Sequence, residues 1–303
     1  MFLLLFIIDD QLSLFLIDYF ETVSIIIGDF CLKFKYLVII FNVIIVFFLL
    51  SILLLPFMVM GPEFAVNFWK STWLVALVLI LVLIGFNVFF LANHRFFRLL
   101  EREDWPALAY YLEQQVYGKS RYSSQKVRLL VNSYLVMCDF ASISRLESKL
   151  EIVKPALITE NLQVFGAARI LSGDYNGAVA FYTKNLEKGK LKDEQWIRWF
   201  LGFSQMLTGS FNQAELEFKS LAATSGNGLI TGLSAYFLGN NLARHSLKAV
   251  ECRSISENGR ERVRKEFKNI VEWKKEMEKA GTDIHTAIIR KYIDEAGVWL
   301  FDQ

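Results

Sequence analysis

Three histidines and three cysteines are the side chains of this 303-residue chain best suited to metal binding or nucleophilic catalysis. They are scattered along it: His94, His245, His285, Cys31, Cys138 and Cys252. No histidine has a second ligand at the i, i+4 spacing that is the minimum signature of a helical metal site. No cysteine belongs to a CxxC pair or has a nearby histidine to activate its thiol. We therefore expect no metal, no cofactor and no catalytic residue, although active sites are assembled in space and a catalytic function stays open.

Phosphate-binding and nucleic-acid-binding patterns are also missing. Gly226, Gly228 and Gly232 match neither GxGxxG nor GxxxxGK[ST], and no predicted strand precedes them, so a loop between helices is the better interpretation. The net charge is only +2, and the basic residues of 257–279 intermix with acidic ones, which favours a solvated helix face. We expect no nucleic-acid partner, and no small-molecule substrate is evident.

One aromatic stretch, Trp196 to Leu207, favours a binding site. Trp196, Trp199 and Phe203 share a helical stripe at i, i+3 and i+7, and the helix is apolar on more faces than one hairpin needs. We predict that these three side chains, with Gln163 from the preceding hairpin, line a groove for a peptide segment of a protein partner. The alternative is that the C-terminal helices simply bury this stretch.

The elements that position these residues belong to a chain of two unlike parts. Residues 1–92 contain nine charged side chains, whereas the remainder has the composition of a soluble protein. Residues 36–60 have no charge, and residues 73–92 form a second apolar run of about the ~20 residues that cross a bilayer. We expect two transmembrane helices at 36–60 and 73–92, joined by a short loop at 61–72 into a hairpin.

The segment 1–35 is apolar but interrupted by acids. Asp9, Asp10 and Asp18 leave no charge-free run of the ~20 residues that a span needs. Without a basic start or a small-residue cleavage site, a secretory signal is disfavoured. An interfacial helix and an extension without a role both stay open.

Basic residues near the span ends predict the orientation. Five flank the outer ends of the hairpin: Lys33, Lys35, Arg95, Arg98 and Arg102. The connecting loop contains only Lys70. By the positive-inside rule both outer ends, and the C-terminal part with them, should be cytoplasmic. We expect a multi-pass integral protein of a bacterial inner membrane.

The part that follows, 93–250, contains four similar turns: Asp104-Trp105, Asp139-Phe140, Asp174-Tyr175 and Ser210-Phe211. Their aromatic residues are 35, 35 and 36 positions apart, and amphipathic stretches lie between them. A fixed period in this range is typical of stacked helix-turn-helix units. Because no breaker follows residue 92, the second membrane helix should run on into this part.

Two of these units match each other in more detail. The matching positions are Gly166 and Gly202, Gly173 and Gly209, Ala178 and Ala214, and Tyr182 and Phe218. With these residues the chain resembles the tetratricopeptide repeat (TPR) family. The resemblance covers 159–225 well and 93–158 loosely, and Asn185 and Leu221 replace a small residue that is usual in the family. It implies an α-solenoid whose concave surface binds a protein or peptide partner.

Further helices are predicted after Ser225. Leu229–Leu238 and Leu242–Val250 should form a fifth hairpin joined at 239–241. Glu257–Lys279 has the pattern of one long amphipathic helix. Its apolar face should contain Val263, Phe267, Ile270, Val271 and Met277.

A last helix should reach Leu300, with Thr282 or Asp283 as its cap. Its candidate packing residues are Ile284, Ile288, Tyr292 and Trp299. The amphipathic helices of 251–303 should close the end of the solenoid, which would otherwise expose an apolar face.

The predicted architecture is therefore all-α: a two-helix transmembrane hairpin, then an α-solenoid of TPR-like hairpins, then C-terminal capping helices. We expect a non-catalytic scaffold in the lipid bilayer that recruits or organises protein partners at the membrane. The alternative is an accessory subunit of a membrane enzyme or transporter that docks through the hairpin. Asn42 and Asn87 inside the spans would support it, although these amides can equally pair with each other.

Overall fold

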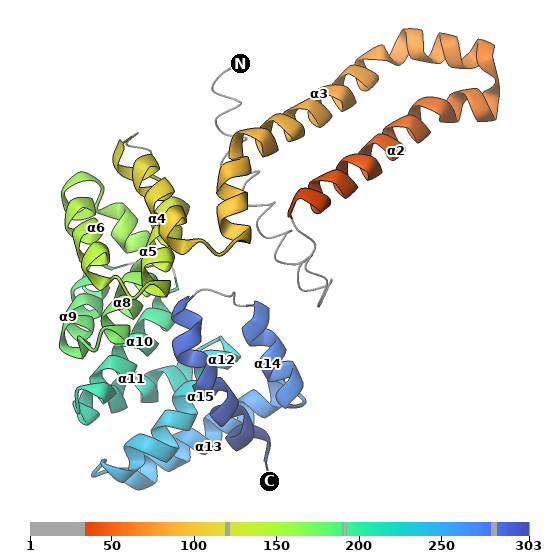
Figure 1. The fold of residues 1–303 in the computed structure, drawn as a ribbon. Helices are drawn as coiled ribbons and strands as arrows, with labels where there is room; N and C mark the ends of the chain where they lie inside the picture. Colours follow the sequence, from red (N-terminus) through yellow and green to blue (C-terminus); the bar gives the residue numbers. More distant parts are fainter. Residues whose placement is uncertain (1–33, 119–121, 190, 192, 280–283, 303) are drawn as a thin grey trace. The chain divides into compact units, whose positions relative to one another are not determined.

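The computed structural model describes residues 34–118, 122–189, 191, 193–279 and 284–302, and all regular structure in these ranges is helical. The chain divides into two compact units, Met1–Asp104 and Trp105–Gln303. Figure 1 labels the helices along the chain. The alternatives predicted for the N-terminal segment, and the side chain of Lys33, lie outside the described residues.

The first unit contains two long apolar helices, α2 (Phe34–Met60) and α3 (Pro62–Glu101). Their segments Ile39–Met60 and Trp73–Glu101 are long and apolar enough to cross a membrane. Only 6% of the most apolar window of each segment is buried. A core helix of a soluble protein would be mostly covered, so these two helices offer their apolar side chains to the surroundings.

The connection between these helices is shorter than predicted. The sequence predicts a loop at 61–72, but α3 already begins at Pro62, and Gly61 is the one non-helical residue between the helices. Gly61 has φ of 82°, a value that glycine adopts without strain. Proline suits the first position of a helix because it has no N–H to leave unpaired, and Glu63 complements the positive end of the helix dipole.

At its other end, α3 continues without a break to Glu101. The prediction that the second apolar helix runs on past residue 92 is therefore confirmed. The unit boundary lies further on, between Asp104 and Trp105.

Inside the hairpin, the two amides of the apolar helices meet. Asn87 Nδ2 donates a hydrogen bond of 2.8 Å to Asn42 Oδ1. Next to them the rings of Phe41 and Phe86 lie 4.1 Å apart. The two amides thus pair with each other inside the hairpin, which is one of the two possibilities that the sequence left open.

The second unit is a succession of shorter helices. In chain order they are α4 (Trp105–Glu113), the π-helix η1 (Gln114–Gly118), α5 (Ser124–Val136), α6 (Phe140–Val153), α7 (Ala156–Glu160), α8 (Leu162–Leu171), α9 (Tyr175–Leu186), α10 (Glu194–Leu207), α11 (Phe211–Thr224), α12 (Gly228–Tyr236), the π-helix η2 (Phe237–Asn241), the 3-10 turn η3 (Leu242–Arg244), α13 (Ala249–Glu266), α14 (Ile270–Lys279) and α15 (Ile284–Phe301). From α8 to α13 each α-helix packs against the next one (Figure 1). The helix pairs predicted on either side of the turns at 139, 174 and 210 are all present.

The four predicted turns share one backbone geometry. The residue two positions before each aromatic has a positive φ: 52° at Glu103, 55° at Cys138, 80° at Gly173 and 78° at Gly209. In each turn the next N–H bonds to the carbonyl five residues back, as Asp174 N does to Arg169 O at 2.9 Å and Ser210 N does to Gln205 O at 2.8 Å. This is the Schellman ending, which closes a helix and reverses the chain. Asp139 and Asp174 then cap the following helices through their side chains.

Glycines allow the helices flanking these turns to pack closely. A Cβ atom built on Gly166 of α8 would overlap the ring of Tyr182 of α9. The corresponding Gly202 of α10 faces Phe218 of α11, where an added Cβ would lie 3.3 Å from the ring. Tyr182 and Phe218 are both fully buried. In both helix pairs, the glycine of the first helix therefore lies against the aromatic ring of the second.

The region predicted as a fifth hairpin differs from expectation. Residues 239–241 do not form a turn but lie in the π-helix η2, and helix 242–250 is replaced by the short η3 and a turn. The second helix of the pair is α13, which begins at Ala249. Two glycines explain the arrangement, because Gly239 of η2 meets Ser256 of α13 and Gly259 of α13 meets Ala235 of α12, so that α13 packs directly on α12 and η2.

The long helix predicted over 257–279 is interrupted. α13 ends at Glu266, Phe267 adopts an extended backbone, and α14 begins at Ile270 with Asn269 accepting hydrogen bonds from the N–H groups of Val271 and Glu272. The break turns the ring of Phe267 onto buried Trp273, 5.7 Å away. Val271, predicted on the apolar face, is instead exposed.

α15 was predicted to end near Leu300, and it extends to Phe301. Its buried face is formed by Ile289, Ile293, Ala296 and Leu300. The predicted packing residues Ile288, Tyr292 and Trp299 lie beside this face and are half-buried. The cap residues at 282–283 and the side chain of Ile284 lie outside the described part.

Arginines of α13 bind the ends of two other helices. Arg262 Nη1 donates to the carbonyls of Ala222 and Ala223 at the end of α11, at 2.8 and 2.7 Å. Arg264 donates to the carbonyl of Leu300 at the end of α15. A helix leaves its last carbonyls without partners, so these guanidinium groups fix both helix ends to α13.

Candidate partner-binding surface

Two of the four predicted groove residues lie in the core. Trp199 and Phe203 of α10 are only 0% and 2% exposed, and their rings stack at 5.3 Å. Phe218 and Phe237 pack around Trp199 at 6.1 and 5.8 Å. Contrary to the sequence prediction, neither side chain has a surface on which a peptide could lie.

The cover over this region comes partly from α15, which packs against α5, α8 and α12. Tyr292 places its ring 5.4 Å from Phe203 and 5.0 Å from Phe237. Nearby, Tyr236 donates a hydrogen bond of 3.0 Å to Glu295 Oε2. Burial, and then this hydrogen bond, raise the pKa of Tyr236 to about 12, so its hydroxyl stays a donor at neutral pH. For Phe203, therefore, the predicted alternative holds: a C-terminal helix, α15, helps to bury its ring.

The other two predicted residues, Trp196 and Gln163, are partly exposed. The ring of Trp196 lies 6.1 Å from that of Trp199, at the edge of the aromatic core. Gln163 is on α8, and no hydrogen bond or ring contact among the described residues joins it to Trp196. The structure therefore leaves partner binding at these two positions as a prediction.

Trp196 lines an open hollow at the N-terminal ends of α10 and α12. The other lining residues are Asp193, Glu194, Gln195, Arg198, Ser220, Leu221, Thr224, Asn227 and Ile230. An indole edge surrounded by hydroxyl, amide and carboxylate groups is suited to a segment with one apolar side chain and a polar backbone. This makes it a candidate surface for a protein segment.

The positive charge of Arg198 in this hollow is neutralised by two carboxylates. Arg198 Nε bonds to Glu194 Oε1 at 2.9 Å, and Arg198 Nη1 lies 3.5 Å from Glu217 Oε2. Burial acts to lower the pKa of Arg198, but the hydrogen bond to Glu194 and the charge of Glu217 outweigh it, so the pKa is raised overall. The arginine is thus held in place, and its charge gives the hollow no preference for an anion.

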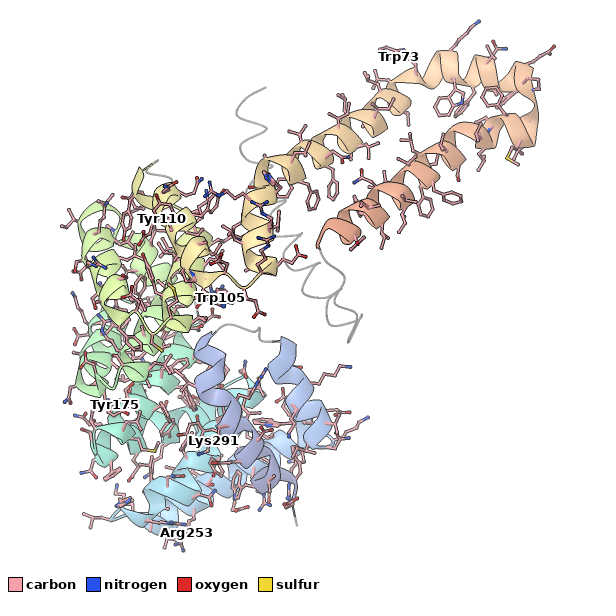
Figure 2. All side chains as sticks on the ribbon, viewed as in Figure 1. Trp73, Trp105, Tyr110, Tyr175, Arg253 and Lys291 are labelled. Carbon is pink, nitrogen blue, oxygen red and sulfur yellow. The ribbon has the colours of Figure 1, made fainter. Side chains whose placement is uncertain are left out.

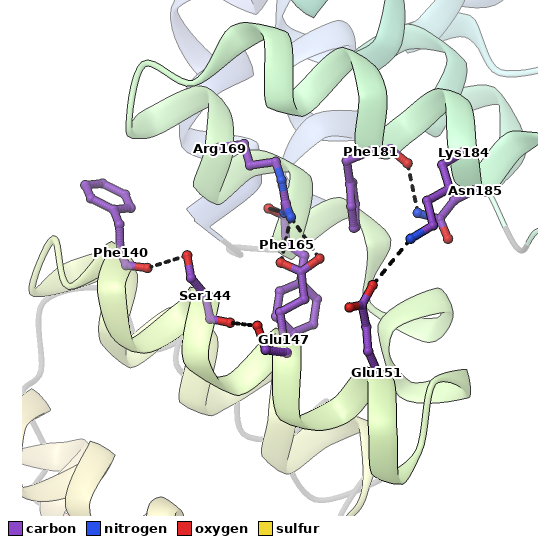
Figure 3. Close-up of polar contacts among 10 residues, drawn as sticks. Phe140, Ser144, Glu147, Glu151, Phe165, Arg169, Phe181, Lys184 and Asn185 are labelled. Atoms are coloured by element: carbon purple, nitrogen blue, oxygen red, sulfur yellow. Dashed lines mark hydrogen bonds and ion pairs between the residues drawn. The ribbon is translucent and has the colours of Figure 1, made fainter.

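Ion pairs between helices contribute to the frame that carries this surface (Figure 3). Arg169 of α8 binds both oxygens of Glu147 of α6 through Nη2, at 2.8 and 2.7 Å. Its guanidinium also lies 4.3 Å above the ring of Phe181 of α9. On the outer side, Lys184 of α9 reaches Glu151 of α6 at 3.4 Å. These contacts join α6, α8 and α9 to one another. Their charged groups are therefore already paired within the protein.

A tyrosine–glutamate pair that the sequence did not indicate joins α4 and α5. Tyr134 of α5 donates a hydrogen bond of 2.5 Å to Glu113 Oε1 of α4. Burial, and then this hydrogen bond, raise the pKa of Tyr134 far above its ordinary value. The phenol is therefore a permanent donor rather than a base. The two residues are 21 positions apart on different helices, so no local motif could have shown the pair.

No group of three or more His, Cys, Asp or Glu side chains gathers within the described ranges in a way that could hold a metal ion. His94 Nδ1 lies 2.9 Å from Leu91 O, and the ring of His245 stacks on Phe211 at 4.3 Å. Cys252 is buried, whereas Cys138 is exposed. The side chain of His285 lies outside the described part.

Comparison with known proteins finds a curated relative and a matching family model. A protein of Treponema pallidum (strain Nichols), described as "Uncharacterized protein", is 32% identical over 162 residues. This alignment covers 54% of the present chain and 51% of the relative, so the chain spans about half the length of the curated relative it matches. No solved structure matches the chain.

A family model described as "Uncharacterised Treponema protein" matches residues 142–302. The match begins in α6 and extends to the end of α15, so α15 lies within the shared region. Because the match covers more than half of the chain, this protein belongs to the family of uncharacterised Treponema proteins.

Proposed function

We propose that this protein is a membrane-anchored helical scaffold that recruits or organises protein partners at the membrane surface. The observation that carries the proposal is that only 6% of the most apolar window in each of the segments Ile39–Met60 and Trp73–Glu101 is buried. Soluble monomers rarely expose large continuous apolar patches, because water disfavours them. Lipid would cover these side chains and turn α2 and α3 into a transmembrane hairpin.

The proposed scaffold is TPR-like. Support comes from the four Schellman turns at a spacing of 35 or 36 residues and from the paired contacts of Gly166 with Tyr182 and of Gly202 with Phe218. Stacked helical hairpins of this kind act mainly by presenting an extended surface to another protein. In this chain α15 already covers part of the aromatic core, so we place the partner on the hollow beside Trp196, with Gln163 as a second contact.

We further propose that the second unit lies in the cytoplasm of a bacterial cell and that its work is non-catalytic. Basic residues at the outer ends of the hairpin support the orientation through the positive-inside rule. A non-catalytic role is supported by two buried titratable side chains, Glu147 and Tyr134. Each forms a hydrogen bond to a side chain on another helix and so contributes to packing.

The anchoring can be tested by alkaline extraction of membranes and by reporter fusions. The full chain should stay in the membrane fraction after carbonate treatment, because transmembrane helices are held by their apolar area rather than by charge. Reporters fused at Gly61 and at Gln303 should indicate an exported loop and a cytoplasmic C-terminus. Release by carbonate would contradict the anchor, and an exported C-terminus would contradict the orientation.

The scaffold role can be tested by purifying the full chain with its partner from mild detergent. Trp196→Ala should lose the partner while its melting temperature changes little. Tyr110→Ala is a matched control, since Tyr110 is an exposed aromatic on another helix, α4 (Figure 2). Retention of the partner by Trp196→Ala, or equal loss in both variants, would count against the hollow as the binding surface.

A second candidate function is an accessory subunit that docks through the hairpin. The observation that favours it is that the outward faces of α2 and α3 are uncovered and could meet another membrane protein instead of lipid. The pairing of Asn87 with Asn42 reduces the need for such a partner, because the two amides already bind each other. Replacing residues 34–101 by an unrelated two-span hairpin separates the proposals: a scaffold keeps its partner, and a hairpin-docked subunit loses it.

A further inference from the structure

The segment that joins η3 to α13 carries an exposed aliphatic surface. Leu247 and Val250 have relative exposures of 105% and 83%, the highest, apart from that of Ile152, among the large apolar side chains that the structure describes in the second unit. With Ala249 and Ile255 they line a shallow open hollow at the start of α13. We call residues 244–253 the Leu247 tip.

Cations surround these aliphatic side chains. Arg244, Lys248 and Arg253 are all exposed, and Arg253 projects from the second unit in Figure 2. Neither arginine forms an ion pair with any residue that the structure describes. Lys248 Nζ lies 3.9 Å from Glu251 Oε2, but this carboxylate also lies 3.2 Å from Lys219 Nζ, so two lysines share it. The outer surface of the tip is therefore apolar and positively charged.

The exposure of the tip is enforced by what lies beneath it. His245 stacks on Phe211 of α11, with the two rings 4.3 Å apart and nearly parallel. Ser246 Oγ accepts a hydrogen bond of 2.9 Å from Lys248 N, and Cys252 is fully buried below it. His245 and Cys252 thus make the inward contacts of the segment, while Leu247 and Val250 lie exposed on its outer side.

We propose that the Leu247 tip binds the surface of an anionic lipid bilayer. Leu247 and Val250 enter the boundary between headgroups and acyl chains, while Arg244, Lys248 and Arg253 contact the negatively charged headgroups. Peripheral membrane-binding segments combine these features, an apolar face that enters the interface and cations that attract anionic lipids. A protein partner is the less favoured occupant, because protein interfaces are enriched in aromatic residues and depleted of lysine, and the tip contains no exposed tryptophan, tyrosine or phenylalanine.

This inference rests on the membrane anchoring in the proposed function, since tethering to a bilayer raises the effective concentration of lipid around the second unit. Contact through the tip would add to the binding of the hairpin to the same membrane. Each cation near an anionic surface should strengthen the contact about fivefold. Loss of all three cations should therefore weaken the equilibrium for tip contact roughly a hundredfold.

The test uses the full chain in proteoliposomes that contain nitroxide-labelled lipid. A fluorophore is placed on Val250→Cys in a background of Cys31→Ser and Cys138→Gly, which leaves only the buried Cys252. Parallel labels at Val82→Cys, in α3, and at Ile152→Cys, exposed on α6, report on the anchor and on a tip-independent surface. We expect lipid to quench the label at 250 in phosphatidylserine-containing vesicles but not in phosphatidylcholine alone.

Charge variants complete the experiment. The triple variant Arg244→Gln, Lys248→Gln, Arg253→Gln should lower quenching at 250 to the level at 152. The control triple Lys154→Gln, Lys265→Gln, Lys275→Gln removes the same net charge from exposed positions elsewhere and should leave quenching at 250 unchanged. If 82 is quenched and 250 is not, the tip proposal is overturned while the anchor stands. If 82 itself is not quenched, the proposed anchoring fails, and the tip proposal fails with it.

Discussion

Gly166 of α8 lies against the ring of Tyr182 of α9 so closely that a Cβ atom on the glycine would overlap the ring. The corresponding contact one unit later, between Gly202 and Phe218, is looser, with an added Cβ at 3.3 Å from the ring. The Tyr182 hydroxyl, which the phenylalanine lacks, finds no hydrogen-bond partner within the described ranges. Burial raises the pKa of this phenol far above its ordinary value, so it remains neutral in the core.

The two glycines should therefore respond differently to alanine. Gly166→Ala should lower the free energy of unfolding by about 1–3 kcal/mol, because the methyl group overpacks a buried ring. Gly202→Ala should be nearly neutral, since a small shift of Phe218 makes room and alanine favours the helix by about 1 kcal/mol. Thermal melting of the full chain in detergent, followed by circular dichroism, measures both. Equal stability of the two variants would contradict the difference in packing.

Cys138 occupies a turn position at which the next two units have glycine. Its φ of 55° is unfavourable for a residue with a side chain, by about 1–2 kcal/mol. Cys138→Gly should therefore stabilise the protein by up to about 1 kcal/mol, whereas Gly173→Ala should destabilise it by about 1–2 kcal/mol.

Ser148→Gly is the control for this comparison, because Ser148 is an exposed residue inside α6 where glycine has no conformational advantage. It should lower stability by about 0.5–1 kcal/mol. Melting temperatures of the three variants decide the matter. A destabilised Cys138→Gly protein would contradict the inference that the left-handed backbone at Cys138 is strained.

Trp199 and Trp196 are three residues apart but should behave unlike each other. Trp199→Ala removes a fully buried indole and should lower the free energy of unfolding by about 3–5 kcal/mol. Trp196→Ala removes a partly exposed side chain at the edge of the same cluster, so its effect on stability should be clearly smaller. Denaturant titration of both variants gives the comparison. Similar losses would place Trp196 in the core as well.

Asp139, which caps α6, should make stability depend on acid. Hydrogen bonding from Ser142, and to a smaller extent the charge of Arg145, lower the pKa of Asp139 below its ordinary value of 3.8, against the opposing effect of burial. Because the folded-state pKa is the lower one, this contribution to stability is present above about pH 4 and is lost as the pH falls through the folded-state pKa.

Asp139→Asn keeps a capping side chain that cannot titrate. The variant should therefore be less stable than the parent protein at pH 7, and this difference in stability should shrink as the pH falls to 3. Ser142→Ala removes the main hydrogen-bond donor to the carboxylate and should reduce the pH dependence in the same sense. Melting temperatures measured across this pH range test both. A stability difference that grows as the pH falls would contradict the inferred lowering of the Asp139 pKa.

The helices α5, α6 and α8 to α11 could be predicted from the sequence because their ends are set locally, whereas the short α7 was not predicted. A residue in the left-handed region, an aspartate cap and an aromatic follow one another within three positions at the turns before α6 and α9. These signals act over a few bonds and need no knowledge of the rest of the chain. The break between α13 and α14 has no such signal, because the apolar pattern continues through Phe267 while the chain bends to place its ring on Trp273.

The sequence by itself determined the all-helical class, the two apolar segments of membrane length and the turns at 139, 174 and 210, because periodicity and turn chemistry are local properties. The tertiary structure decided which apolar faces are buried and which remain exposed. Trp199 and Phe203 looked available for a partner, yet Phe237 and Tyr292 cover them from parts of the chain more distant in sequence. Leu247 looked like part of a helix, yet it remains exposed. Burial depends on every element that packs nearby, so one helix's pattern shows that a face is apolar but not what will cover it.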